Sequence, residues 1–207
     1  TIVITSLKVS FSAVFIASLF AIPLGVIIAL NRFIGKKILI ICLNTLMALP
    51  TVVIGLILYG ILNRRGLLGD FDFLYTQIAI IIGLCILIIP VILNLTITAV
   101  YSADSRLADR CTLLGASQIQ KVFIYISESR YALMTGIITG FGRAIGEVGI
   151  AMMVGGNIEG LTRTMTTAIA LETSKGSFEF ALSLGIVLLF IALIINVVLY
   201  YFQQKDI

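Results

Sequence analysis

The sequence predicts an all-α integral membrane protein, with five transmembrane helices in a single domain over residues 1–207. Three observations predict this class. Of the 207 residues, 60% are apolar and only 12% are charged, whereas a soluble domain is roughly half apolar and a quarter charged. Five stretches approach the roughly 20 apolar residues that a membrane-spanning helix needs. Their apolar residues do not alternate with polar ones, which favours helices over the strands of a barrel.

The five predicted spans cover residues 7–30, 38–62, 78–100, 132–154 and 180–202. Each of the first three contains one proline: Pro23, Pro50 and Pro90. Proline removes a backbone donor and can kink a helix. These prolines either shape the helices or open a shared pathway. Pro50 is our candidate for a pathway role, because Thr51 places a hydroxyl beside the break.

The composition excludes several functions for this chain. Histidine, the commonest metal ligand, is absent, and three scattered cysteines are too few for a metal site or a disulfide framework. No phosphate-binding loop, metalloprotease motif or nucleophile elbow is present. The basic residues flank the spans instead of forming one patch. We therefore expect no enzyme activity, no metal or cofactor in this chain and no nucleic-acid partner.

The positive charges in the connections predict the orientation, because cytoplasmic loops carry the excess of Lys and Arg. One side of the predicted bundle has eight such residues and the other has five. This bias predicts an external N-terminus, a cytoplasmic C-terminus and a cytoplasmic connection over residues 101–131. The eight residues are Arg32, Lys36, Lys37, Arg106, Arg110, Lys121, Arg130 and Lys205, and the five are Lys8, Arg64, Arg65, Arg163 and Lys175.

The cytoplasmic connection, with its distinctive part at about residues 103–130, predicts two short helices joined by a turn. Leu107, Cys111 and Leu114 follow helical spacing. Asp104 or Ser105 can cap the first helix, Gly115 suits a left-handed turn at its end, and Ser117 can cap the second. The first helix suits either a groove in another protein or the lipid surface, and spacing alone does not decide between them.

Two segments resemble a known family. Residues 109–117 read DRCTLLGAS and residues 140–149 read GFGRAIGEVG. Together they look like the EAA loop and adjoining helix of permease subunits from binding-protein-dependent ABC importers. The VGGNI run at 154–158 is most similar to the molybdate and tungstate branch, and LPTVVIG at 49–55 looks closer to tungstate permeases. This chain departs from the family pattern where the usual Glu-Ala-Ala is Asp-Arg-Cys and a common proline is Ser129.

The resemblance implies a type I ABC importer permease that lies in a bacterial or archaeal cell membrane. Residues 104–117 would be its coupling helix, seated in a cleft of a separate ATPase subunit that binds ATP and Mg²⁺. Two copies would form a homodimer, with an extracytoplasmic solute-binding protein outside. ATP-driven alternating access would import an oxyanion, tungstate ahead of molybdate. The implied ATPase-coupling residues are Arg106, Leu107, Asp109, Arg110, Leu114, Gly115 and Ala116.

A charged pair inside the fourth predicted span is the main pathway candidate. Arg143 and Glu147 are four residues apart, so a continuous helix places them on one face. Charges at this depth are costly unless they are paired or hydrated. The pair either neutralises itself or a neighbouring helix and holds the bundle in register, or Arg143 contacts a passing oxyanion. The complete set of pathway or gate candidates is Pro50, Thr51, Arg143, Gly146, Glu147 and Asn157.

Two further hypotheses concern the glycines and threonines. The pairs 136/140 and 142/146 match the small-xxx-small spacing that lets helices approach closely in lipid. The external segment 154–167 is rich in glycine and threonine. Its amides and hydroxyls either donate to an oxyanion or belong to a flexible loop that fills the mouth of the bundle.

The alternative function is an ATP-independent channel or secondary carrier. It would use Arg143 and Glu147 as part of an ion or proton route. The amphipathic segment 104–117 favours the importer, because a channel has no need to expose such a helix.

Overall fold

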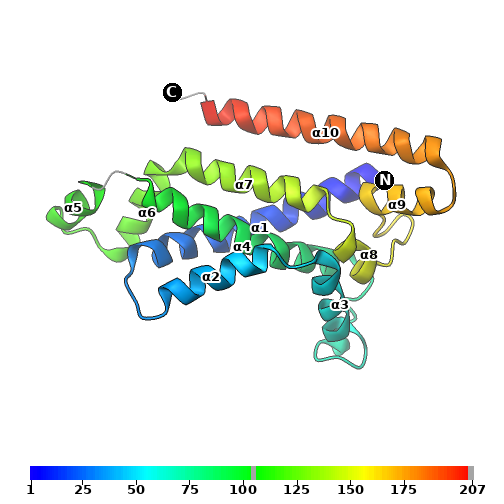
Figure 1. Ribbon diagram of the computed structural model, residues 1–207, viewed down its shortest axis with the longest axis horizontal. Helices are drawn as coiled ribbons and strands as arrows, with labels where there is room; N and C mark the ends of the chain where they lie inside the picture. The colour runs from blue at the N-terminus through cyan, green and yellow to red at the C-terminus, as the bar shows by residue number, and fades with distance from the viewer. Residues whose placement is uncertain (104–105, 205–207) are drawn as a thin grey trace.

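The computed structural model is a bundle of long helices, with a helical elbow at one end and a helix projecting from its side near the other (Figure 1). It describes residues 1–103 and 106–204, so the predicted caps Asp104 and Ser105 lie outside the described residues. None of the described residues forms a strand. The predicted all-helical class is therefore confirmed.

Three of the predicted spans are single helices long and apolar enough to cross a membrane. They are α1 (Ile2–Leu30), α4 (Gln77–Tyr101) and α10 (Phe178–Gln204). Pro23 and Pro90 lie inside α1 and α4 without ending them. Two bent helix pairs bring the number of spans to at most five.

Small residues on α1 form the contact with α4. Ala13, Ala17, Ala21 and Gly25 repeat every four residues and are all buried. A Cβ atom on Gly25 would lie 2.7 Å from Thr96 Cγ2 of α4. The backbones of α1 and α4 can therefore approach closely because these side chains are small.

The second predicted span is not one continuous helix, and its two helices are long and apolar enough for a span only when they are taken together. It consists of α2 (Lys36–Met47) and α3 (Thr51–Leu62), which are bent by 98° to each other. The physical cause is Pro50, which has no backbone N–H and disfavours helical geometry in the residue before it. Pro50 becomes the N-cap residue of α3, and Figure 1 shows α3 projecting from the side of the bundle.

The fourth predicted span is also broken. α7 (Arg130–Ile145) and α8 (Gly149–Gly155) are bent by 57° to each other. Gly136 and Gly140 of α7 pack against α4, where a Cβ on Gly140 would lie 3.1 Å from Ile92 Cδ1. This confirms close packing for the first glycine pair. Gly142 meets nothing within 4 Å, so the second pair makes no such contact in this chain.

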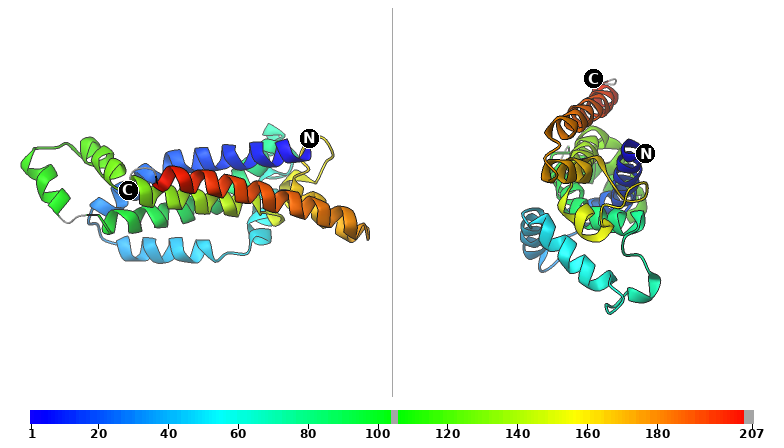
Figure 2. Two further views of the ribbon diagram at one scale, coloured as in Figure 1. Left: turned by 90° about the horizontal axis from the view of Figure 1, so that it is seen from above. Right: turned by 90° about the vertical axis from the view of Figure 1, so that its right-hand side faces the viewer.

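The two ends of the bundle carry different elements (Figures 1 and 2). The N-terminus, α8 and α9 (Met165–Ser174) lie at one end. The short 3-10 helix η1 (Gly69–Phe71) belongs to the loop after α3. The elbow of α5 (Arg106–Leu113) and α6 (Gln118–Glu128) lies at the opposite end, toward which α10 runs. This arrangement agrees with an odd number of crossings, as the sequence predicted.

Candidate functional site

The two helix breaks pack against each other. Thr51 is the first residue of α3 and Gly149 is the first residue of α8. A Cβ on Gly149 would lie 2.9 Å from Thr51 Oγ1, and a Cβ on Gly55 would lie 3.0 Å from Met153 Cβ. Because glycine is present at both positions, α3 and α8 contact each other closely. The short segments beyond the two breaks therefore form one packed unit.

Arg143 bridges the two breaks. In a continuous helix the Met47 carbonyl would accept a hydrogen bond from the Thr51 N–H, but the bend after α2 removes that donor. The Arg143 Nη2 atom donates to this carbonyl oxygen at 2.9 Å instead. The half-buried guanidinium thus replaces a backbone donor on another helix.

Arg143 and Glu147 do not form the predicted pair. No ion pair between these two described residues is present. Glu147 lies in the break, where its Oε1 accepts a hydrogen bond from the Ile150 N–H at 3.0 Å. Because the helix ends at Ile145, the two residues do not share a helix face. The prediction of a paired face is wrong for that reason.

The Glu147 carboxylate caps the start of α8 inside the protein. The residue is 9% exposed, and its carbonyl oxygen accepts a hydrogen bond from Thr166 Oγ1 at 2.8 Å. A negative charge is favourable at a helix N-terminus. Beside it lies a cavity of about 10 Å³, lined in part by Ser6, Ser10 and Thr164. This cavity has both polar and apolar walls and is about the size of one water molecule.

Two asparagines that sequence reasoning missed complete a polar cluster near the first break. Asn94 Nδ2 of α4 donates to Asn44 Oδ1 of α2 at 2.8 Å and lies 3.5 Å from the Met47 sulfur. Asn44 is exposed and Asn94 is half-buried, in helices that are otherwise apolar. Polar side chains at this depth face a partner or water rather than lipid. We call Asn44, Met47, Asn94 and Arg143 the break cluster.

The remaining pathway candidates flank this cluster or lie beyond it. Pro50 is exposed at the first break and Gly146 is exposed at the second. Asn157 lies in the segment after α8, in a left-handed conformation with φ of 51°. Its Nδ2 donates to the Thr167 carbonyl at 3.4 Å, and its buried Oδ1 has no hydrogen-bond partner. Asn157 is therefore part of a separate group at the N-terminal end of the bundle.

The threonines of the external segment hold that segment together. Thr162, Thr164, Thr166 and Thr167 are all buried. Thr162 donates to the Gly155 carbonyl, and Thr164 and Thr167 form a capping box at the start of α9. These hydroxyls are used within the fold, so the threonine-rich part of the segment is packed and not a loose loop.

The loop before α4 is attached to α8 at the same end. The Tyr75 N–H donates to the Val154 carbonyl at 2.8 Å. A side-chain hydrogen bond with Tyr59 raises the pKa of Tyr75 above its usual value, and burial adds to this shift. The loop before α4 is therefore linked to α8 through a backbone hydrogen bond and to α3 through Tyr59.

The elbow has the predicted helix, turn and helix. Gly115 has φ of +64°, and the Ala116 N–H donates to the Cys111 carbonyl at 2.9 Å. Ser117 and Gln120 form a capping box at the start of α6. The prediction of a left-handed glycine turn followed by a serine cap is confirmed.

The residues of the predicted apolar stripe on α5 do not all face the core. Leu107 packs against the core and Cys111 is buried, whereas Leu114 is 83% exposed. Leu113, which sequence reasoning missed, is 87% exposed. Arg106 and Arg110 are exposed on α5, Gly115 is exposed in the turn and Ala116 is half-buried, while the side chain of Asp109 lies outside what the structure describes.

Four large apolar side chains are exposed on the elbow: Leu113, Leu114, Ile119 and Phe123. A groove of about 380 Å³ between α5 and α6 is lined by Cys111, Leu114, Ala116, Gln120, Phe123 and Ile124. Exposed apolar side chains around such a groove are typical of an interaction surface.

The fold and these two sites define a class of helical membrane transport component, and comparison with known proteins identifies the family. Residues 21–205 match the binding-protein-dependent transport system inner membrane component family, and the chain belongs to it. This confirms the resemblance of residues 109–117 and 140–149. The chain is a multi-pass protein of the cell membrane.

Several relatives match nearly the whole chain. It is 40% identical over 205 residues to the tungstate uptake system permease protein TupB of Peptoclostridium acidaminophilum, across 99% of this chain and 90% of the relative. It is 35% identical over 201 residues to a probable anion ABC transporter permease protein of Haloferax volcanii, across 95% and 87%. Identity to the molybdenum transport system permease protein ModB of Escherichia coli is 29% over 205 residues, across 93% and 88%.

Proposed function

We propose that this chain is the permease subunit of an ABC importer that carries tungstate from an external binding protein into the cytoplasm. The observation that carries the proposal is the 40% identity to a tungstate permease over 99% of the chain. Identity to the molybdenum permease is lower, at 29%. Tungstate is therefore the first substrate to test and molybdate the second.

The elbow is the proposed contact with the ATPase subunit. Leu113 and Leu114 would be its apolar anchors, with Arg106 and Arg110 at the polar rim. ATP and Mg²⁺ would bind to the ATPase, not to this chain. Because α6 continues into α7 through the single residue Ser129, a push on the elbow would reach the helix that carries Arg143. Rigid helices transmit such displacements between interfaces.

The break cluster is the proposed contact with the passing anion. A guanidinium carries five N–H donors, and the one described hydrogen bond of Arg143 goes to Met47. The Asn44 and Asn94 side chains add neutral donors beside it. These groups could replace part of the hydration of a tetrahedral dianion without a tight binding site. Pro50, Thr51, Gly146 and Glu147 would then shape the gate, with Asn157 at its outer end.

Two copies of the chain would enclose the route. Five spans do not surround a path by themselves, and a two-fold axis along the membrane normal supplies ten. Thr135 and Thr139 of α7 line a groove with Asn196 of α10, of about 360 Å³. This partly polar groove is the proposed region where the second copy approaches.

Reconstitution tests the proposal. Purified receptor, permease and ATPase are placed together in liposomes, and uptake of labelled tungstate and molybdate is measured with and without ATP. We expect uptake that requires ATP and receptor, with tungstate preferred. Equal uptake of both anions without ATP would contradict the proposal and favour a channel or a secondary carrier.

A further inference from the structure

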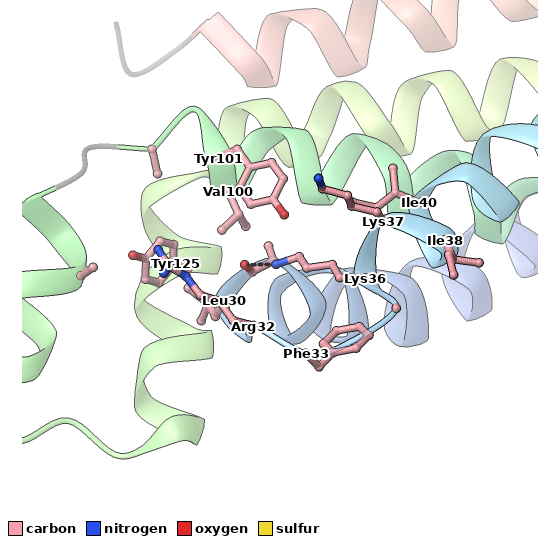
Figure 3. A pocket seen from close by; sticks show the side chains of 14 residues that line it. Leu30, Arg32, Phe33, Lys36, Lys37, Ile38, Ile40, Val100, Tyr101 and Tyr125 are labelled. Carbon is pink, nitrogen blue, oxygen red and sulfur yellow. Dashed lines mark hydrogen bonds between the residues drawn. The ribbon is translucent and has the colours of Figure 1, made fainter.

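A large open pocket lies at the elbow end of the bundle and belongs to neither site described above (Figure 3). Its volume is about 950 Å³. The connection between α1 and α2 forms one wall, the end of α4 forms another, and Ala108 and Tyr125 of the elbow complete it. The pocket thus lies at the level where three apolar helices begin or end.

Three cations surround this pocket, and none of the described residues that line it is acidic. Lys36 Nζ donates to the Ala29 and Asn31 carbonyls at 2.7 and 2.9 Å, and lies 5.3 Å from the centre of the Tyr101 ring. It therefore caps the end of α1 while its charge stays at the pocket. Arg32 and Lys37 are exposed. The net positive charge of the lining favours an anionic ligand.

The rest of the lining is apolar or aromatic. Leu30, Phe33, Ile38 and Val100 form apolar walls next to the cations, and Tyr101 is 56% exposed at the rim. Ile34 beside the pocket is fully exposed. Apolar walls contribute nothing to the binding of a small hydrated anion. A phospholipid offers both an anionic headgroup for the cations and acyl chains for the apolar walls. Aromatic and basic residues are also enriched where helices meet the membrane surface.

We propose that this pocket binds the phosphate headgroup of an anionic phospholipid from the leaflet at the elbow end, with Arg32 and Lys37 as the principal contacts and the apolar walls against the upper acyl chains. Basic pockets between membrane helices are suited to such headgroups. Because the pocket includes elbow residues, a bound lipid would support the wall from which α5 projects. The proposal does not depend on which anion is transported.

Native mass spectrometry of the permease purified with its ATPase tests the proposal. The apparent affinity for phosphatidylglycerol is compared with that for phosphatidylcholine, in the wild type and in the R32Q/K37Q variant. We expect the wild type to prefer phosphatidylglycerol. The variant should bind it about 25-fold more weakly, roughly fivefold for each lost cation. Phosphatidylcholine binding should not change.

Two further variants separate a site from a general charge effect. K8Q/R65Q removes two exposed positive charges at the other end of the bundle and should leave binding unchanged. R32K/K37R keeps the charges and should retain most of the affinity. This variant controls for the effect of substitution itself, apart from the loss of charge. Equal loss in K8Q/R65Q, no loss in R32Q/K37Q, or loss in R32K/K37R as large as in R32Q/K37Q would overturn the proposal. Displacement of the lipid by millimolar phosphate or tungstate would also overturn it, in favour of a soluble-anion site.

Discussion

The Arg143 guanidinium donates to the Met47 carbonyl oxygen at 2.9 Å and so connects the last residue of α2 to the last turn of α7. Both helices break within a few residues of this hydrogen bond. The bond therefore links the two breaks, and we expect a displacement of α7 to be passed to α2.

Replacing Arg143 with Met should remove this link. A hydrogen bond to a charged group is worth about 1.5–3 kcal/mol, so we expect the free energy of unfolding to fall by about that amount. ATP-dependent uptake should fall as well. Denaturation in detergent measures the first effect and liposome uptake the second. The Arg65→Met variant is the matched control, since Arg65 is exposed in the loop after α3. Equal effects of the two substitutions would contradict a bridging role.

The hydrogen bond between Asn44 and Asn94 should have a small effect on stability and a larger one on transport. A double-mutant cycle with Asn→Leu substitutions should give a coupling energy of about 0.6 kcal/mol, the average for hydrogen bonds between membrane helices. Each single variant should lower uptake by about tenfold if these amides contact the anion. Uptake that falls only in proportion to the amount of folded protein would mean that the pair is merely structural.

The chain's long apolar segments predicted its class. Pro50 was the candidate for the first break, but the extent of that bend and the second break were not predicted. Residues 38–62 and 132–154 lie in helix pairs that are together long and apolar enough to span a membrane, and Pro23 and Pro90 lie in helices that continue. Whether a proline bends or breaks a helix depends on neighbours that can replace the lost hydrogen bond. At Pro50 the replacement donor is Arg143, which is 96 residues away along the chain. Local patterns do not contain that information.

Prediction succeeded at the elbow because its signals are local. Gly115 and Ser117 specify a turn and a cap from their own backbone and side-chain chemistry. The direction of each leucine depends instead on what packs against α5. Leu107 turns toward the core and Leu113 turns outward, and an i, i+4 pattern alone does not distinguish these faces.

Replacing Gly115 with Val should uncouple transport from hydrolysis. A Cβ at this position would meet nothing within 4 Å, so the cost lies in the positive φ, about 1–2 kcal/mol for a residue with a Cβ. We expect the tungstate transported per ATP hydrolysed to fall by about fivefold or more. Gly115→Asn tests the conformational argument, because Asn tolerates the left-handed region. Loss of coupling in both variants, or in neither, would contradict it.

The close approach of α1 to α4 predicts opposite effects for two Gly→Ala substitutions. At Gly25 the new methyl group would overlap Thr96 and should destabilise the protein by about 1–3 kcal/mol. At Gly185 of α10 nothing lies within 4 Å, so alanine should be neutral or stabilise by up to about 1 kcal/mol. Thermal unfolding of both variants in the same detergent measures the difference. A tolerated Gly25→Ala would show that the helices are less tightly packed than described.

The position of the elbow on the cytoplasmic side is the central claim, and cysteine labelling tests it most directly. In a variant with Cys42, Cys85 and Cys111 replaced by alanine, single cysteines are introduced at Lys121 in the elbow and at Arg65 in the loop after α3. A membrane-impermeant maleimide is then applied to intact cells and to permeabilised cells. We expect labelling at position 65 in both and at position 121 only after permeabilisation. Labelling of position 121 in intact cells would place the elbow outside, where no ATPase could drive it.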